Sequence, residues 1–170
     1  NALNIRRSEC DKALKILNKR GWSISNLSEI EIDDLEKVET HLDEPLARRV
    51  RHVVEENGRV KEGILALARN DLDSFGEIMT ESHRSSRNLY EVSHTNLDLL
   101  VKLSIEIPGV KGARLTGAGF GGAIVALVDG PHIEEYTIQI EREYHERTGL
   151  HPYVNIFSIP GGVKVAQVSH

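Results

Sequence analysis

A glycine-dense stretch, Gly117 to Gly122, contains the residue types that most directly suggest chemistry. It reads Gly-Ala-Gly-Phe-Gly-Gly, and a stretch of strand character flanks it on each side. Glycine lacks a Cβ and adopts positive φ freely, so such a turn can lie against a ligand or another main chain with its N–H groups directed outward. The candidate phosphate-contacting residues are Gly117, Ala118, Gly119, Phe120, Gly121 and Gly122. A hairpin that packs tightly and binds nothing is the alternative interpretation.

Two familiar phosphate-binding loops do not fit this stretch. The spacing G-x-G-x-x-G is present from Gly117 to Gly122, but a dinucleotide fingerprint needs a helix to begin at its third glycine. Residues 123–128 read Ala-Ile-Val-Ala-Leu-Val, which predicts a buried strand instead. For a P-loop, Ala123 stands where the lysine is needed and Ile124 where the Mg²⁺-binding hydroxyl is needed.

Two further polar segments are candidates for a site. The basic cluster Arg48-Arg49-Arg51-His52 could meet a phosphate, although a solvated helix face explains the same residues. The segment from Glu81 to Arg87 holds three serines, a histidine and two arginines, and its role stays open because serine and arginine could simply cap a helix end. No two of the eight histidines lie three or four residues apart, so we expect no metal site.

Composition limits the function classes. The chain has 170 residues, a net charge of −5 and no concentrated basic patch, so we expect one soluble domain without a nucleic-acid partner. No apolar run approaches the ~20 residues of a membrane span, so no membrane partner is expected. Cys10 is the only cysteine, which predicts a cytoplasmic protein without an internal disulfide. Because the chain starts at Asn1 and its only methionine is Met79, we expect a fragment or a processed product.

Hydrophobic periodicity divides the chain into two parts. Helical spacing dominates residues 1 to about 107, and strand-like runs dominate about 108 to 170. Asp71 is typical of a helix N-cap, and Thr95 followed by Asp98 resembles a capping box. The first part is therefore predicted to supply helices and the second part a sheet.

The second part predicts strands on both sides of the glycine stretch and a helix from about Pro131 to Arg147. Two more β-prone runs follow, Tyr153 to Ile159 and Val163 to Val168, with a Pro-Gly-Gly turn between them. The predicted fold class is α+β, in which helices cover a mostly antiparallel sheet of about four strands.

Four strings, taken together, resemble the C-terminal half of galactokinase, in the GHMP kinase superfamily. They are Ile5–Arg7 with Glu9–Cys10, Arg48–Val54, Glu81–His83 through Tyr90–Ser93, and Arg114–Gly122. They occur in the family's order and spacing and cover nearly the whole chain. The resemblance implies a ferredoxin-like GHMP kinase C-terminal domain, residues 1–170, that forms one wall of a cleft. ATP with Mg²⁺ and a sugar would bind between this domain and an N-terminal lobe.

The resemblance also implies where the chemistry lies. The glycine stretch matches a family loop at the cleft, near the phosphates and against the N-terminal lobe. The family's catalytic residues lie in that lobe, so none is assigned in this chain, and the isolated chain is expected to be inactive. The substrate implied by the resemblance is galactose, giving galactose 1-phosphate, or a related sugar. Leu3 departs from the family pattern, because it stands at the position of a sugar-contacting tyrosine. The alternative is a free-standing ferredoxin-like module that binds a small molecule or a partner without catalysis.

Overall fold

The computed structural model describes residues 2–158, and it builds them from helices followed by a short sheet. The helices before the sheet are α1 (Ala2–Lys19), η1 (Leu27–Glu29), η2 (Ile32–Asp34), α2 (Leu35–Glu39), α3 (Leu46–Ala68), α4 (Leu72–Ser85), the π-helical η3 (Ser86–Tyr90) and α5 (Thr95–Glu106). The later elements are β1 (Val110–Thr116), β2 (Ala123–Val128), η4 (Gly130–His132) and α6 (Ile133–Thr148). Within the described part of the chain, no helix is both long and apolar enough to cross a membrane.

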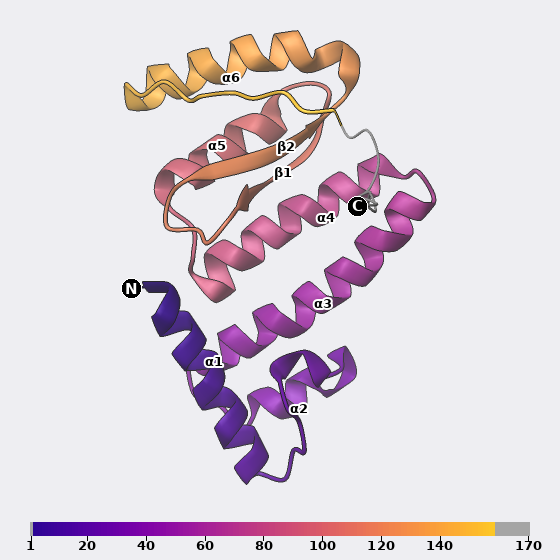
Figure 1. The fold of residues 1–170 in the computed structure, drawn as a ribbon, viewed down its shortest axis with the longest axis vertical. Helices are drawn as coiled ribbons and strands as arrows, with labels where there is room; N and C mark the ends of the chain where they lie inside the picture. Colours follow the sequence, from indigo (N-terminus) through magenta and orange to yellow (C-terminus); the bar gives the residue numbers. More distant parts are fainter. Residues whose placement is uncertain (1, 159–170) are drawn as a thin grey trace, which may run out of the picture.

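The elements stack in a fixed order along the molecule (Figure 1). Figure 1 shows α4 running between α3 and the sheet, with β1 on the α4 side and β2 on the α6 side. The two strands are antiparallel, in a register that ends with Thr116 opposite Ala123. Helix α5 packs on the sheet and also contacts α6. The turn between the strands therefore emerges at one end of a sheet supported by α4 and α5.

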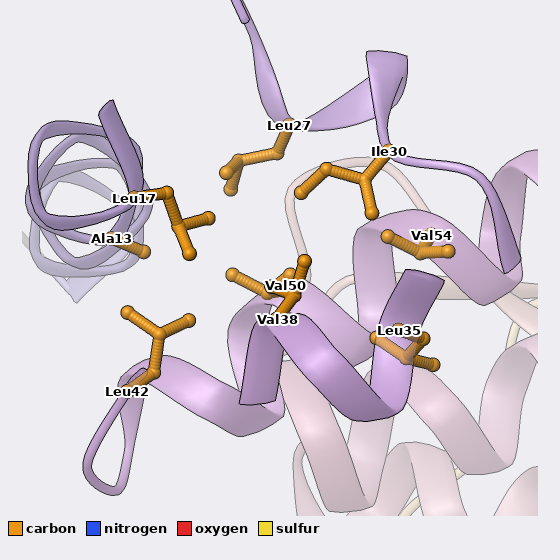
Figure 2. Close-up of a cluster of buried hydrophobic side chains, with 9 residues drawn as sticks. All are labelled: Ala13, Leu17, Leu27, Ile30, Leu35, Val38, Leu42, Val50 and Val54. Atoms are coloured by element: carbon orange, nitrogen blue, oxygen red, sulfur yellow. The ribbon is translucent and has the colours of Figure 1, made fainter. Parts of the chain in front are cut away.

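A first hydrophobic cluster fills the space between α1, α2, α3 and the loop that carries η1 (Figure 2). Its members repeat at helical spacing within each helix, which places their side chains on one face. They are Ala13, Leu17, Leu27, Ile30, Leu35, Val38, Leu42, Val50 and Val54. This cluster fixes α1 against α3.

A second cluster joins α5 and α6 to the sheet. Its buried members are Leu103, Ile107, Tyr136, Ile140 and Tyr144. Tyr136 keeps a polar partner inside the cluster, because its hydroxyl lies 2.9 Å from the Oγ of Ser104. The second cluster holds the sheet from the side opposite α4.

Helix α4 lies directly on the edge of β1, because two glycines meet there. A Cβ on Gly112 would lie 1.8 Å from the carbonyl oxygen of Gly76, and a Cβ on Gly76 would lie 2.2 Å from that of Lys111. The hydroxyl of Thr80 donates to Gly76 at 3.2 Å and accepts the N–H of Ala113 at 3.3 Å. Side chains of α4 thus satisfy backbone groups that an edge strand would otherwise leave unpaired.

The prediction of about four strands is not confirmed. Residues 153–158, which belong to the predicted strand Tyr153 to Ile159, form no strand and run beside α6 instead (Figure 1). Val154 packs against the second cluster. Strand propensity alone does not make a strand, because a strand also needs a pairing partner, and within the described residues the sheet contains only β1 and β2. The run Val163 to Val168 lies outside the described residues.

Candidate functional site

The glycine turn, defined as residues 117–122, joins β1 to β2. Positive φ angles occur at Gly117, Gly119, Phe120, Gly121 and Gly122. Non-glycine residues rarely adopt this region, so the backbone path itself requires the glycines that the sequence contains. The turn is a specific backbone conformation that other sequences would not readily form.

The glycines of the turn serve two different purposes. A Cβ on Gly119 would lie 2.0 Å from the carbonyl oxygen of Val92, so this residue permits a close contact between two main chains. A Cβ on Gly121 would meet no heavy atom within 4 Å, and the same holds for Gly117 and Gly122. Tight packing, the alternative interpretation, therefore accounts for Gly119. The other three glycines leave open space above the backbone.

Hydrogen bonds fix the backbone inside the turn and just before it. The N–H of Phe120, inside the turn, donates to the carbonyl oxygen of Val92 at 2.6 Å. The N–H of Leu115, two residues before the turn, donates to Nδ1 of His83 at 3.3 Å. Both acceptors belong to the segment that runs from α4 through η3 to the start of α5. This segment is thus the support of the glycine turn.

A buried histidine and a carboxylate connect the two anchors. His83 is 2% exposed, and its Nε2 lies 3.2 Å from Oδ1 of Asp98 in α5. Asp98 also accepts a hydrogen bond from the Oγ of Ser93 at 2.6 Å. Burial lowers the pKa of His83, although the Asp98 carboxylate opposes that shift, so the ring is neutral at pH 7. A neutral ring that accepts at Nδ1 carries its proton on Nε2, toward Asp98.

The capping box predicted for Thr95 and Asp98 is wrong, whereas the predicted N-cap at Asp71 is confirmed. The carboxylate of Asp71 accepts from the N–H of Ser74 at 3.0 Å. The N-cap of α5 is His94, whose Nδ1 accepts from the N–H of Asn96 at 3.2 Å. Asp98 instead accepts a hydrogen bond from Ser93, and its carboxylate lies 3.2 Å from Nε2 of the buried His83.

The segment Glu81 to Arg87 is a packing face of α4 and η3. Its buried residues are Ser82, His83, Ser85 and Ser86. Ser82 donates to the carboxylate of Glu56 in α3, and Ser85 lies 2.8 Å from Nδ1 of His52, also in α3. Ser82 and Ser85 therefore hold α4 against α3, whereas Ser86 is the C-cap of α4, as the capping interpretation expects.

At Arg49, both interpretations of the basic cluster in α3, a phosphate contact and a solvated helix face, are wrong. Arg49 is neither on a solvated face nor open to a phosphate, because it is 1% exposed. Its Nε donates to Glu9 at 2.7 Å, its Nη2 donates to Glu91 at 2.6 Å, and its Nη1 donates to the carbonyl oxygen of Leu89. The neighbouring Arg48 binds Glu44 and Glu91. These two arginines form structural ion pairs, and the pairs with Glu9 and Glu91 join distant parts of the chain.

Glu91 connects this ion-pair cluster to the glycine turn. It adopts a left-handed backbone conformation at φ 54, directly before Val92. Hydrogen bonding from Arg49 is the main cause that lowers the pKa of Glu91. Arg6 of α1 lies 3.5 Å from the same carboxylate. Helices α1 and α3 therefore position the residue that precedes the contact with the turn.

These contacts bring the two sequence-predicted sites to one side of the molecule. Leu3 lies one helical turn before Arg6 in α1 and is 38% exposed. Through Arg6 and Glu91, this end of α1 connects to Val92 and so to the glycine turn. Figure 1 shows the start of α1 and the turn between β1 and β2 at the same side of the fold.

A stacked pair supports η3 from within. The rings of His52 and Tyr90 lie 4.5 Å apart and nearly parallel. Burial lowers the pKa of His52 to about 4 and raises that of Tyr90 to about 12. The Tyr90 hydroxyl also lies 3.9 Å from the Sγ of Cys10. Neither ring changes charge near neutral pH, so the pair is a structural contact.

A comparison with known families identifies the part of the chain that forms this site. Residues 64–138 match the family described as GHMP kinases C terminal. This part of the chain is thus similar to GHMP kinase C-terminal domains. The matched residues include His83, Asp98 and the whole glycine turn. Arg6 and Arg49 lie outside the match.

Relatives of the domain cover almost the whole chain. A galactokinase of Clostridium acetobutylicum is 42% identical over 162 residues, which are 95% of this chain and 41% of that protein. A galactokinase of Fusobacterium nucleatum is 38% identical over 160 residues, which are 94% of this chain and 41% of that protein. The predicted resemblance to the C-terminal region of galactokinases is confirmed.

The fold of the domain also matches a solved structure. The crystal structure of Lactococcus lactis galactokinase complexed with galactose superposes with a TM-score of 0.85 at 35% identity, over 89% of this chain and 39% of that chain. This chain thus spans 39% of the chain in that structure and 41% of the curated relatives it matches.

Proposed function

We propose that this chain is the C-terminal lobe of an ATP-dependent sugar kinase. The reaction would transfer the γ-phosphoryl group of ATP to a hydroxyl of galactose or a related sugar. The observation that carries the proposal is the glycine turn, open above Gly121 and held at Leu115 and Phe120, in a chain 42% identical to a galactokinase.

The turn suits the electrostatic part of phosphoryl transfer. This reaction depends on positioning and on stabilising charge on the phosphate oxygens, which preorganised N–H groups can do. Open space above Gly117, Gly121 and Gly122 lets a phosphate approach the backbone. Mg²⁺ would accompany ATP. No three potential metal ligands gather within residues 2–158, so the proposal assigns its ligands to ATP and the N-terminal lobe.

The proposal places the catalytic acid-base group in the N-terminal lobe. A general base works best with a pKa near the operating pH. Burial would raise the pKa of Glu9 and Glu56, but hydrogen bonds and charges from their partners, arginines among them, lower both values overall. Arginines lower the pKa of Glu91 as well. These three carboxylates bind arginines within the fold and have lowered pKa values, which supports placing the acid-base group in the N-terminal lobe.

Sugar preference is proposed to depend on the start of α1. The complex of the Lactococcus lactis galactokinase with galactose supports a sugar as the substrate class. We propose that Leu3 faces the sugar and that the absence of a phenol there changes the preference among sugars. A cytosolic location, inferred from the single cysteine, completes the proposal.

A coupled ATPase assay with a panel of hexoses tests the function. The full-length protein should phosphorylate galactose or a related sugar, whereas the purified chain of residues 1–170 should show only background turnover. Turnover by the chain alone would refute the two-lobe assignment. A full-length protein that transfers phosphate to no sugar would refute the kinase itself and favour a binding module.

A further inference from the structure

We propose that His83 is a positioning residue of this kinase, which fixes the glycine turn in the conformation that receives the phosphates. The inference rests on the proposed function. It assigns a role to a side chain that lies beneath the turn and contacts no substrate. The role follows from the two hydrogen bonds that anchor the turn.

The first step concerns how few contacts hold the turn. Its open glycines contact nothing above them, so they add no packing that would select one backbone path. Glycine also loses the most conformational freedom when it is ordered. Selection therefore depends on the bonds at Leu115 and Phe120, which end on His83 and Val92.

The second step concerns the link between these two anchors. The Nε2 of His83 lies 3.2 Å from Asp98, and Asp98 accepts from Ser93 at 2.6 Å. Ser93 directly follows Val92, whose carbonyl oxygen holds Phe120. The anchor at Leu115 is thus linked to the anchor at Phe120 through the side chains of His83, Asp98 and Ser93. The Asp98 carboxylate lies beside Nε2, while Nδ1 of the same imidazole accepts the N–H of Leu115.

The third step concerns what a misplaced turn would do. Displacement of a catalytic element by about 1 Å can reduce rates on the order of 100-fold, because the reacting groups lose their alignment. A turn released at Leu115 would still be connected to both strands. The enzyme would then stay folded while its affinity for the phosphates falls.

Two substitutions at position 83 separate the hydrogen bond that Nδ1 accepts from Leu115 from the contact between Nε2 and Asp98. In His83→Asn, the amide oxygen can take the place of Nδ1 and accept from Leu115. In His83→Gln, the longer side chain can reach Asp98 but leaves the N–H of Leu115 unpaired. In the full-length enzyme, we expect the KM for ATP to rise at least about tenfold in His83→Gln, and to stay within about threefold of the original value in His83→Asn. The KM for the sugar should stay unchanged in both variants.

Thr80→Val is the matched control, because Thr80 anchors the same strand edge at Ala113, farther from the turn. It should lower the melting temperature and leave the KM for ATP unchanged. Ser93→Ala removes the hydrogen bond to Asp98 and keeps the two anchoring hydrogen bonds at Leu115 and Phe120. It should raise the KM for ATP by a smaller factor. This variant provides the test if His83→Gln fails to fold.

Each outcome decides the proposal. An unchanged KM for ATP in a folded His83→Gln, or in Ser93→Ala when His83→Gln does not fold, would overturn the positioning role. An equal rise in Thr80→Val would also overturn it, because any loosening of β1 would then have the same effect. If the unsubstituted enzyme neither binds ATP nor phosphorylates a sugar, the proposed function has failed instead.

Discussion

At the scale of single residues, most of the polar side chains that first suggest chemistry turn out to hold the backbone. Arg49, His52 and His83 have the residue types of a phosphate or acid-base site, yet each is paired inside the fold. The glycines are different, since they are predictable as a turn from the sequence and the structure places them at the end of the sheet.

Alanine substitutions should separate the two kinds of glycine in the turn. In Gly119→Ala, the new Cβ would lie 2.0 Å from the carbonyl oxygen of Val92, so the support must move and both stability and activity should fall. In Gly121→Ala, only the positive φ is penalised, at about 1–3 kcal/mol, because the space is open. Urea denaturation and kcat of the full-length enzyme measure both effects. An equal loss of stability in the two variants would contradict the contact at Val92.

Arg49→Met should destabilise the protein by about 1.5–3 kcal/mol, because it removes charge-assisted hydrogen bonds to Glu9 and Glu91 that a buried guanidinium makes. Arg48→Met is the matched control, since Arg48 also binds Glu91 but is more exposed and should lose much less. The free energy of unfolding from urea titration measures the difference. Similar losses in both variants would show that burial of Arg49 has no special weight.

Leu3→Tyr should improve the use of galactose by the full-length enzyme. A phenol adds a ring that can pack on the sugar and a hydroxyl that can bind it, and one such polar contact changes discrimination by ~1–3 kcal/mol. The measurement is kcat/KM for galactose and other hexoses in both proteins. Efficient galactose turnover by the unsubstituted enzyme would argue against a role of Leu3 in specificity.

The sequence alone could not identify the supports of the site. Arg49 and Glu9 are 40 residues apart, and His83 and Leu115 are 32 residues apart, so no local spacing signals either pair. The interpretation of the arginines failed because a basic helix face looks the same whether its partners are solvent or distant carboxylates. Only the density of serine and histidine after Glu81 marked α4 as unusual.

At the scale of elements, local signals predicted helices better than strands. Helix caps such as Asp71 are set by neighbouring residues, so the sequence contains them. A strand forms only when it pairs with another strand, and the local sequence does not indicate which strand that is. The β-prone run after Tyr153 forms no strand within the described residues: Val154 packs against the second cluster, whereas Tyr153 and Phe157 are exposed.

The contact between α4 and β1 should be the least tolerant of added volume. Gly76→Ala would place a Cβ 2.2 Å from the carbonyl oxygen of Lys111, so α4 must separate from the strand and the free energy of unfolding should fall by several kcal/mol, on the order of a severe core overpacking. Gly58→Ala is the control within a helix, where nothing lies within 4 Å of the new Cβ.

Helix propensity predicts that the control Gly58→Ala raises stability by about 0.5–1 kcal/mol. The two alanine variants should therefore change stability in opposite directions, which thermal unfolding followed by circular dichroism can measure. A Gly76→Ala protein as stable as the unsubstituted protein would contradict the close approach of α4 to β1.

At the scale of the whole molecule, two hydrophobic clusters lie on either side of a polar layer. The first cluster holds α1, α2 and α3, and the second holds α5, α6 and the sheet. Between them, α3, α4 and β1 are joined by partly buried polar contacts and by histidines, including the contacts of Glu56 with Ser82 and Arg114. The stability of this middle layer should therefore depend on pH more strongly than that of the clusters.

Acid should destabilise the molecule before its carboxylates titrate. Burial lowers the pKa of His52 from 6.5 to about 4, and burial also lowers that of His83. Between those values the unfolded chain binds more protons than the folded one, so the free energy of unfolding falls as pH falls from about 6.5 toward 4, by at most roughly 3 kcal/mol for His52. Urea midpoints from pH 8 to 4 measure this slope, which His52→Gln should reduce. An unsubstituted protein whose midpoint stays constant from pH 7 to 5 would contradict the neutral, buried state of His52.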